Sequence, residues 1–280
     1  MSVPSKEKRV LLSGNEAVAR GAFEAGVKVA SAYPGTPSTE ILENFANYEG
    51  VYAEWAPNEK VAVEVAIGAS MAGVRALSTM KHVGVNVAAD PIFTVSYTGV
   101  RGGLVIVAAD DPEMHSSQNE QDSRHYAVAA KIPMLEPSDS AEARAYTLLA
   151  YELSEKYDTP FFLRSTTRIA HAKGAVEIGE PVTPPVAPGI VRDPAKWVML
   201  PMNARKRHVL VEARTRALVE YAETSGINRV EAGDKALGIV TGGVAYQYVK
   251  EAFPTASVLK LGMAWPMPEK LIRDFAATVD

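Results

Sequence analysis

The segment VKVASAYPGTPSTEILENFANY, residues 27–48, contains one complete strand–loop–helix unit. Residues 27–33 form an apolar run typical of a buried strand, and the sequence YPGTPST interrupts this run with two prolines and a glycine. Residues 37–48 then have the spacing of a helix, and Pro37 is suited to its first turn. This unit predicts an α/β fold in which strands and helices alternate along the chain.

The same alternation extends outward from this unit over the first 165 residues. On its N-terminal side, residues 9–12 are strand-like, and Ser13 with Glu16 forms a capping box for a helix that reaches Ala25. On its C-terminal side, strands are expected at 51–54, 75–80, 103–109, 133–136 and 160–165, and helices at 57–71, 84–93 and 139–157. The strands are apolar runs rather than alternating patterns, which predicts a doubly wound, mostly parallel sheet covered on both faces.

Composition divides the chain into three parts. Residues 1–170 are expected to form the main α/β domain. Residues 171–204 hold six of the chain's 18 prolines, between Pro181 and Pro201, and have little periodicity, so they are expected to be a linker. A second β/α rhythm begins within residues 205–280 and predicts a smaller, incomplete α/β domain.

The charge balance and the cysteine content exclude several classes of protein. The 280 residues include 29 Lys plus Arg, 33 Asp plus Glu and no cysteine, which gives a formal net charge of −4 at pH 7. This balance excludes the strongly basic composition of a dedicated nucleic-acid binder. The lack of cysteine excludes disulfides, thiol nucleophiles and thiolate-held iron–sulfur clusters within this sequence. A signal-peptide pattern and a stretch of 18 apolar residues are both absent, so a cytoplasmic protein without membrane spans is expected.

Polar residues gather where predicted strands end, which is where open α/β sheets bind their ligands. Thr36 and Ser38 follow the strand at 27–33, at a helix start whose free N–H groups suit a carboxylate or phosphate. Glu59 lies in the first turn of the next helix, where it complements the helix dipole or, when desolvated, holds a proton near neutral pH. From residue types alone, an ordinary capped turn and a helix-start acid are the favoured interpretations.

Two further polar stretches also follow predicted strands. The first is KHVGVN, residues 81–86, which places His82 beside a lysine. The second is DDPEMHSSQNEQDSR, residues 110–124, a long loop without regular pattern, and such loops are often functional. The glycine turn at 241–243 lacks the spacing of a phosphate-binding fingerprint, so a plain tight turn is favoured there. The sequence contains no metal-ligand spacing such as H-E-x-x-H, and no metal site is predicted.

Four ordered segments together resemble one enzyme family: AYPGTPSTEI, APNEKVAVEVAIGASMAG, KHVGVNVAADP and DDPEMHSSQNEQDSR. They are similar to the thiamine-pyrophosphate-dependent 2-oxoacid:ferredoxin oxidoreductases, and most of all to alpha subunits of the indolepyruvate type. The resemblance covers essentially the whole chain in order and spacing, and it is strongest over residues 10–170.

This resemblance implies roles for individual residues. Residues 1–170 would be the pyrimidine-binding-type domain of a thiamine enzyme. Glu59 would hydrogen-bond the aminopyrimidine ring of thiamine pyrophosphate and so activate the cofactor, and Pro34 and Gly35 would also contact it. Thr36 would bind the substrate carboxylate. The remaining polar lining of the substrate site is expected from His82, Asn86, His115, Gln118 and Arg124.

The activity that the resemblance implies is the oxidative decarboxylation of a 2-oxoacid to an acyl-CoA, with coenzyme A and ferredoxin taking part. Pyruvate-specific relatives carry an arginine for the substrate carboxylate after the strand equivalent to 104–109, whereas this sequence has Asp110 there. A bulky aryl pyruvate such as indolepyruvate is therefore the expected substrate class.

The resemblance also implies that this sequence holds half of an active site. The family needs a domain that binds the pyrophosphate and Mg²⁺, as well as iron–sulfur clusters, and this sequence provides neither. Residues 205–280 match the start of a domain like the C-terminal domain of transketolase. The expected partners are the remaining pyrophosphate-binding and ferredoxin-type portion and a second subunit, in a homo- or hetero-oligomer, with no nucleic acid and no membrane. The alternative interpretation is a non-catalytic α/β binding or assembly module, which fits the missing half-site and the small residues at 62–73.

Overall fold

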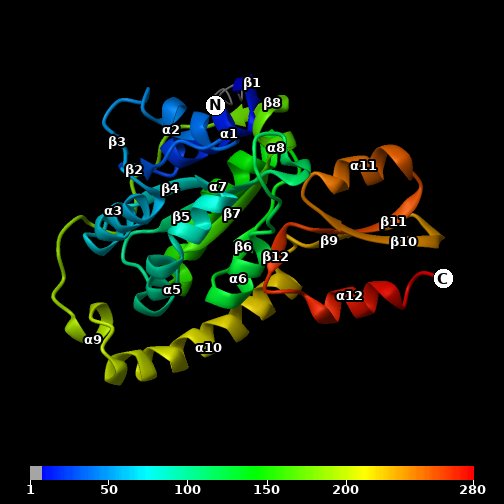
Figure 1. The fold of residues 1–280 in the computed structure, drawn as a ribbon. Helices are drawn as coiled ribbons and strands as arrows, with labels where there is room; N and C mark the ends of the chain where they lie inside the picture. Colours follow the sequence, from blue (N-terminus) through cyan, green and yellow to red (C-terminus); the bar gives the residue numbers. More distant parts are fainter. Residues whose placement is uncertain (1–7) are drawn as a thin grey trace, which may run out of the picture.

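The computed structural model describes residues 8–280, so the first seven residues of the predicted domain 1–170 lie outside the described part. Figure 1 shows one large twisted sheet with helices around it and a smaller sheet beside it, formed by the C-terminal part of the chain. In spatial order the strands of the large sheet are β12 (Met263–Trp265), β6 (Met134–Leu135), β7 (Phe161–Thr166), β5 (Leu104–Asp110), β4 (Ala76–Lys81), β2 (Val29–Ala32) and β3 (Tyr52–Trp55). All neighbouring pairs are parallel except β12 with β6, so the predicted doubly wound, mostly parallel α/β fold is confirmed.

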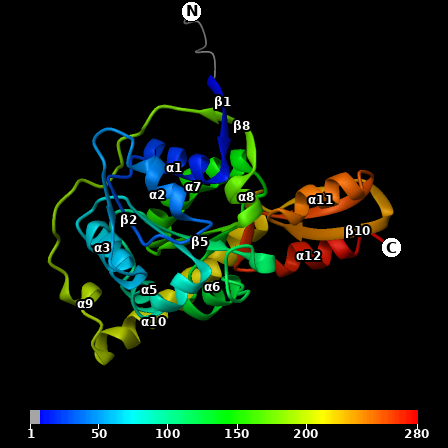
Figure 2. The same cartoon turned by 45° about the horizontal axis from the view of Figure 1, so that its top comes forward.

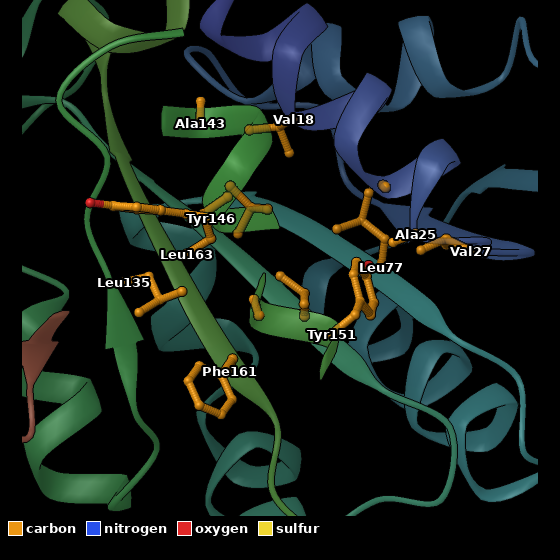
Figure 3. Close-up of a cluster of buried hydrophobic side chains, with 14 of the residues drawn as sticks. Val18, Ala25, Val27, Leu77, Leu135, Ala143, Tyr146, Tyr151, Phe161 and Leu163 are labelled. Carbon is orange, nitrogen blue, oxygen red and sulfur yellow. The ribbon is translucent and has the colours of Figure 1, made fainter. Parts of the chain in front are cut away.

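Helices cover both faces of the large sheet. On one face lie α1 (Gly14–Glu24), α2 (Thr39–Phe45) and α7 (Ser140–Tyr157), where Val18 and Tyr151 pack with Leu77 in a buried cluster (Figure 3). On the other face lie α3 (Glu59–Met71), α4 (His82–Val87), α5 (Ala89–Thr98) and α6 (Arg124–Ala130), around a second cluster that includes Met80. Because both faces are covered, all seven residues of β5 are buried, which explains its uninterrupted apolar run.

Three helix boundaries differ from the sequence-based expectation for local reasons. α3 begins at Glu59 rather than at residue 57, because the Asn58 side chain caps it by accepting the backbone N–H of Val61 at 3.0 Å. α2 begins after Ser38, because the preceding residues form a turn closed on a backbone carbonyl. The single helix expected at 84–93 is divided into α4 and α5. Pro91 lacks an N–H group and therefore fits the first turn of a new helix rather than the interior of a continuous one.

The segment expected to be a linker, 171–204, contains a strand that the sequence pattern did not predict. After α8 (Thr167–His171), β8 (Lys173–Ile178) pairs antiparallel with β1 (Lys8–Ser13) in a separate two-stranded sheet. This pairing joins segments that are distant in sequence, so no local pattern indicates it. Beyond residue 178 the chain runs around the outside of the large layer to α9 (Pro194–Trp197) and α10 (Pro201–Thr224), as Figure 2 shows. The domain limits 1–170, 171–204 and 205–280 stay predictions.

The C-terminal part of the chain forms the smaller sheet. Its strands lie in the order β10 (Asp234–Gly242), β11 (Ala256–Leu261) and β9 (Arg229–Glu231), and α11 (Ala245–Ala252) and α12 (Glu269–Ala276) lie on opposite sides of it (Figure 1). The strand expected at 257–263 is divided between two sheets, because β12 leaves the small sheet and joins the edge of the large one. The division occurs at Gly262, where an added Cβ would lie 2.4 Å from the Tyr146 hydroxyl and 2.7 Å from the Ile227 carbonyl oxygen. Among residues 8–280, no helix is long and apolar enough to span a membrane.

A buried ion pair attaches the small sheet to the large layer. Lys260 in β11 is fully buried, and its Nζ donates to the Glu142 carboxylate and, at 2.8 Å, to the Ser138 hydroxyl. The same ammonium group lies 4.4 Å from the centre of the Tyr246 ring. An unpaired buried charge would be strongly destabilising, so this contact fixes β11 against the start of α7.

Replacing Ser13 by alanine tests the capping box at the start of α1, where Ser13 and Glu16 each accept the other's backbone N–H. We expect the free energy of unfolding in urea to fall by about 1 kcal/mol, because the Glu16 backbone N–H at the helix start loses its acceptor. The matched control is Thr224→Ala, whose hydroxyl bonds the Glu220 carbonyl at the end of α10, with a change below about 0.5 kcal/mol. Equal stability of Ser13→Ala and the wild type would show that the box contributes nothing.

Candidate functional site

The carboxyl ends of β2 and β4 are neighbours at the point where the chain reverses its direction across the sheet. From β2 the chain passes to β3 at one edge, whereas from β4 it passes to β5 on the other side. The helix after β2 packs on one face of the sheet and the helix after β4 packs on the opposite face. In open α/β sheets, ligands bind at such a point.

The loop after β2 is folded around Gly35. The Gly35 N–H donates to the Thr39 hydroxyl at 2.9 Å, and the Gly35 carbonyl accepts both the backbone N–H and the hydroxyl of Ser38 at 2.9 Å. These bonds use the polar groups at the base of the loop. Pro34 and Thr36, two of the predicted site residues, remain exposed at its tip.

Glu59 lies at the start of α3 with its side chain against α4. An added Cβ on Gly84 would lie 2.6 Å from Glu59 Oε1, so the glycine brings the backbone of α4 next to the carboxylate. The residue is half-buried, and within residues 8–280 its carboxylate has no hydrogen-bond or ion-pair partner. Glu64 is exposed and lines a different pocket, beside Trp197, so the two acids of α3 do not share a site. A half-buried carboxylate that lacks a protein partner is able to bind a ligand.

The polar loop 111–123 contains the short 3-10 helix η1 (Pro112–Met114) and is bonded to the last residue of β4 and to two residues of α4. Lys81 Nζ donates to the Ser116 carbonyl at 2.7 Å, His82 Nε2 lies 3.1 Å from the Asn119 carbonyl oxygen, and Asn86 Nδ2 donates to Gln121 Oε1 at 2.8 Å. Since Nε2 of His82 faces a carbonyl oxygen, Nε2 carries a proton. The Nδ1 atom of His82 is buried and has no hydrogen-bond partner in the described part of the chain.

Asp111 organises the same loop from its buried side. Its carboxylate accepts the backbone N–H of Ser116 at 2.8 Å and the hydroxyls of Ser117 at 2.6 Å and Thr167 at 2.7 Å, with a longer bond from the His115 N–H. Burial disfavours the charged form, but these hydrogen bonds outweigh it and lower the pKa of Asp111 to about 2. Asp111 was not among the predicted site residues, although the two serines that follow it within six residues were a usable signal for such a turn.

Asp110, at the end of β5, is fully buried, and its carboxylate is hydrogen-bonded to other protein groups. Its carboxylate accepts Arg164 Nε at 2.7 Å and the Ser123 backbone N–H at 3.0 Å, which closes the far end of the loop. Arg164 also pairs with Glu136 and lies 3.7 Å from Asp122. Burial opposes the charge of Arg164, but the three carboxylates outweigh it and raise its pKa. Asp110 is therefore half of an internal ion pair at the end of β5.

The remaining predicted site residues lie along the loop and beyond it. Arg124, at the start of α6, pairs with Asp122 at 2.7 Å, and its Nη1 lies 3.9 Å from Glu136. Gln118 is exposed on the loop, and His115 is exposed and lines a pocket with Thr167, Arg168, His171 and Ala172. The structure thus brings Gly35, Glu59 and His82 to the ends of neighbouring strands, and the roles of all these residues stay predictions.

The glycine turn at 241–243 is occupied by protein. An added Cβ on Gly243 would lie 2.6 Å from Glu136 Oε1, so a carboxylate lies directly against this turn. A carboxylate in this place repels a phosphate, which agrees with the interpretation as a plain tight turn.

Comparison with known families and proteins matches the chain to one group. The family model described as pyruvate flavodoxin/ferredoxin oxidoreductase, thiamine diphosphate-binding, matches residues 20–194. Indolepyruvate oxidoreductase subunit IorA of Archaeoglobus fulgidus is 48% identical over 96% of this chain and 45% of its own length. The subunit IorA of Thermococcus kodakarensis is 44% identical over 96% of this chain and 44% of its own length. The chain thus spans about half the length of the curated relatives that it matches.

A solved structure has the same fold as this chain. The 2-oxoglutarate:ferredoxin oxidoreductase from Magnetococcus marinus, a structure with 2-oxoglutarate, coenzyme A and succinyl-CoA bound, matches with a TM-score of 0.80. The match covers 100% of this chain and 58% of that chain at 18% sequence identity. Because the sequence identity is as low as 18%, the likeness establishes the fold alone.

Replacing Asp111 by asparagine tests its role in the loop. The folded-state pKa of about 2 lies below the ordinary aspartate value of 3.8, so the ionised carboxylate contributes stability above about pH 4 and loses it as the pH falls toward 2. We expect Asp111→Asn to lower the free energy of unfolding at pH 7 by about 2 kcal/mol, and the difference from wild type to shrink between pH 4 and pH 2. Urea titrations of both proteins between pH 2 and pH 7 measure this difference in the free energy of unfolding. Asp90→Asn, which breaks the exposed pair with Lys60, is the control with a small effect at every pH. A difference from wild type that is constant with pH would contradict the assignment.

Proposed function

The chain belongs to the thiamine-diphosphate-binding family of pyruvate flavodoxin/ferredoxin oxidoreductases, and from this premise we propose that it provides the cofactor-activating half of a 2-oxoacid oxidoreductase active site. The observation that carries the proposal is the state of Glu59. Its carboxylate is half-buried at the ligand-binding edge of the sheet, it touches the backbone of α4, and it has no partner within residues 8–280.

The surroundings of Glu59 fit the aminopyrimidine ring of thiamine diphosphate. Gly84 lets the Glu59 side chain lie directly against α4, because any side chain at residue 84 would displace the Glu59 carboxylate. We propose that the Glu59 carboxyl shares a proton with a ring nitrogen of the aminopyrimidine, in the manner of a general acid–base group. Pro34 and Gly35, in the loop after β2, are the proposed further contacts. When bound, the cofactor supplies the carbon that adds to the 2-oxo group and the ring that takes up the electrons released with CO₂.

The proposed substrate is an aryl 2-oxoacid, with indolepyruvate as the leading candidate. Two observations support this class. The relatives at 44–48% identity are indolepyruvate oxidoreductase subunits, and Asp110 is buried with Arg164 rather than open to a small substrate. The exposed hydroxyl of Thr36 would hydrogen-bond the substrate carboxylate. The proposed lining of the remaining site is His82, Asn86, His115, Gln118 and Arg124.

The complete reaction requires groups that this sequence lacks. A chain without cysteine cannot hold an iron–sulfur cluster through thiolates, so the clusters would belong to a partner domain or subunit. The pyrophosphate and Mg²⁺ would likewise bind another portion of the enzyme. In the proposed reaction the 2-oxoacid loses CO₂, coenzyme A takes the acyl group, and two ferredoxins each accept one electron.

Replacing Glu59 by glutamine tests the assignment. Glutamine keeps the size of the side chain but cannot exchange a proton with the ring nitrogen, so we expect arylpyruvate-dependent ferredoxin reduction by the assembled enzyme to fall by roughly a hundredfold or more. Deuterium exchange at C2 of added thiamine diphosphate, followed by NMR, should slow by a similar factor. This second measurement does not depend on electron transfer.

The matched control is Glu64→Gln, which removes an exposed acid from the same helix and should leave both rates unchanged. Unchanged rates in Glu59→Gln would contradict the mechanism. An assembled enzyme that binds no thiamine diphosphate at all would favour the alternative of a non-catalytic assembly module.

A further inference from the structure

Lys81 lies at the centre of the candidate site and has no role in the function proposed so far. It is the last residue of β4 and directly precedes α4, so it stands at the reversal point of the sheet, next to the end of β2. Positions at the carboxyl end of a central strand face the ligands of open α/β sheets. The location therefore calls for an account of what this charge binds.

The carbon chain of Lys81 packs against the loop that carries Thr36. An added Cβ on Gly35 would lie 3.4 Å from Lys81 Cβ, 3.5 Å from Cδ and 3.8 Å from Cγ, which is ordinary van der Waals distance. The aliphatic stem thus runs along Gly35, the residue before Thr36. The stem next to Gly35 and the bond from Nζ to the Ser116 carbonyl together place the ammonium group between two loops of the site.

The charge of Lys81 is not neutralised by the protein. Its Nζ donates to the Ser116 carbonyl at 2.7 Å, and within residues 8–280 no carboxylate forms an ion pair with it. Three other cations at this end of the sheet are paired: Lys60 with Asp90, Arg124 with Asp122, and Arg164 with Asp110 and Glu136. Arg168, which follows β7, has no ion pair within residues 8–280 but is exposed and lies beside His115 rather than at the reversal point. An ammonium group can donate three hydrogen bonds, so Lys81 keeps donors for a ligand.

We propose that Lys81 binds the carboxylate of the 2-oxoacid substrate and acts with Thr36 as the anion-recognition element of the site. This inference rests on the proposed function, because that function supplies an anionic substrate at this edge. Charge-assisted hydrogen bonds are about twice as strong as neutral ones, and an uncompensated cation between loops attracts an anion over a longer range.

The chemistry predicts where the effect of Lys81 appears in the kinetics. The carboxylate is fully charged in the bound substrate, and its charge moves into the cofactor as CO₂ leaves. A cation that holds the carboxylate therefore stabilises the bound substrate at least as much as the transition state. Loss of Lys81 should raise KM for the 2-oxoacid and change kcat little.

The test uses Lys81→Gln in the assembled oxidoreductase, with binding measured by calorimetry and KM by ferredoxin reduction. The probes are indole-3-propionate, which has the ring and the carboxylate but no 2-oxo group to react, and its uncharged methyl ester. We expect wild type to prefer the acid by about ten- to a hundredfold, and Lys81→Gln to lose most of this preference, with KM for indolepyruvate raised by a similar factor. Lys81→Arg should retain the preference, because it keeps the charge.

Two controls separate ligand binding from other roles of this residue. Lys60→Gln removes a positive charge next to Glu59 that is already paired with Asp90, so the acid–ester preference should stay at the wild-type value. Ser117→Ala removes a bond from Asp111 to the same loop, and it should leave the preference intact even if the loop is loosened. If Ser117→Ala abolishes the preference as Lys81→Gln does, Lys81 acts by holding the loop and the proposal is wrong.

The outcomes also distinguish this proposal from the function on which it rests. An acid preference that survives in Lys81→Gln, or that is absent from wild type, overturns the role of Lys81 whether or not the enzyme oxidises arylpyruvates. A Lys81-dependent acid preference in an enzyme that oxidises no arylpyruvate supports the anion site and overturns the proposed substrate. Circular dichroism of each variant establishes that it is folded before binding is compared.

Discussion

The parallel pairing of β2 with β4 is the constraint on which the candidate site depends. The register joins Val29 to Ala76 and Ala32 to Thr79, so the two strands end almost level with each other. As a result, the loop that carries Thr36 and the junction that carries Lys81 leave the sheet side by side. Because successive side chains of a strand point to opposite faces of the sheet, a shift of the register by one residue would turn the side chains of β4, Lys81 among them, to the wrong face. The packing of β4 on both faces holds the register, since a one-residue shift would move Leu77 and Met80 out of the two clusters in which they pack and onto opposite faces.

The polar groups of the structure divide into those that the protein satisfies and those that it leaves open. Asp110, Asp111 and Lys260 are buried and have several partners each, as stable buried charges require. Around the reversal point the pattern is different: within residues 8–280 the Glu59 carboxylate and the buried Nδ1 of His82 have no hydrogen-bond partner. Natural proteins seldom leave such groups unpaired except where a ligand completes them. Unpartnered buried atoms also occur away from this point, for example Arg214 Nε and Trp265 Nε1, so the support for the proposed site comes from finding Glu59 and His82 together at the ligand-binding edge of the sheet.

Local sequence patterns predicted most of the elements that build the site, and long-range pairing accounts for what they missed. The capping box at Ser13, the strands at 75–80 and 103–109, and the irregular loop after Asp110 are all properties of short segments, and the structure contains each of them. The pairing of β8 with β1 and the transfer of β12 to the large sheet depend on partners far away in sequence. In the same way, the sequence identified a lysine beside His82 but could not show that its stem packs on Gly35 or that no carboxylate pairs with it. Motif order carried the expectations for Glu59 and Thr36, since their residue types alone favoured an ordinary turn and a helix-start acid.

The arrangement of the three groups around the reversal point agrees with a single ligand assembly. Thr36 belongs to the loop that leads into α2 on one face of the sheet, whereas Glu59 belongs to α3 on the opposite face. Lys81 ends the strand between them, with its stem on Gly35 and with the helix that touches Glu59 starting at the next residue. A cofactor ring on Glu59 and a carboxylate on Thr36 would therefore meet at the end of β4. The proposed role of the positive charge at that meeting point is to bind the substrate carboxylate through donors that its bond to Ser116 leaves open. An assembly module without an anionic ligand would need only the bond to Ser116.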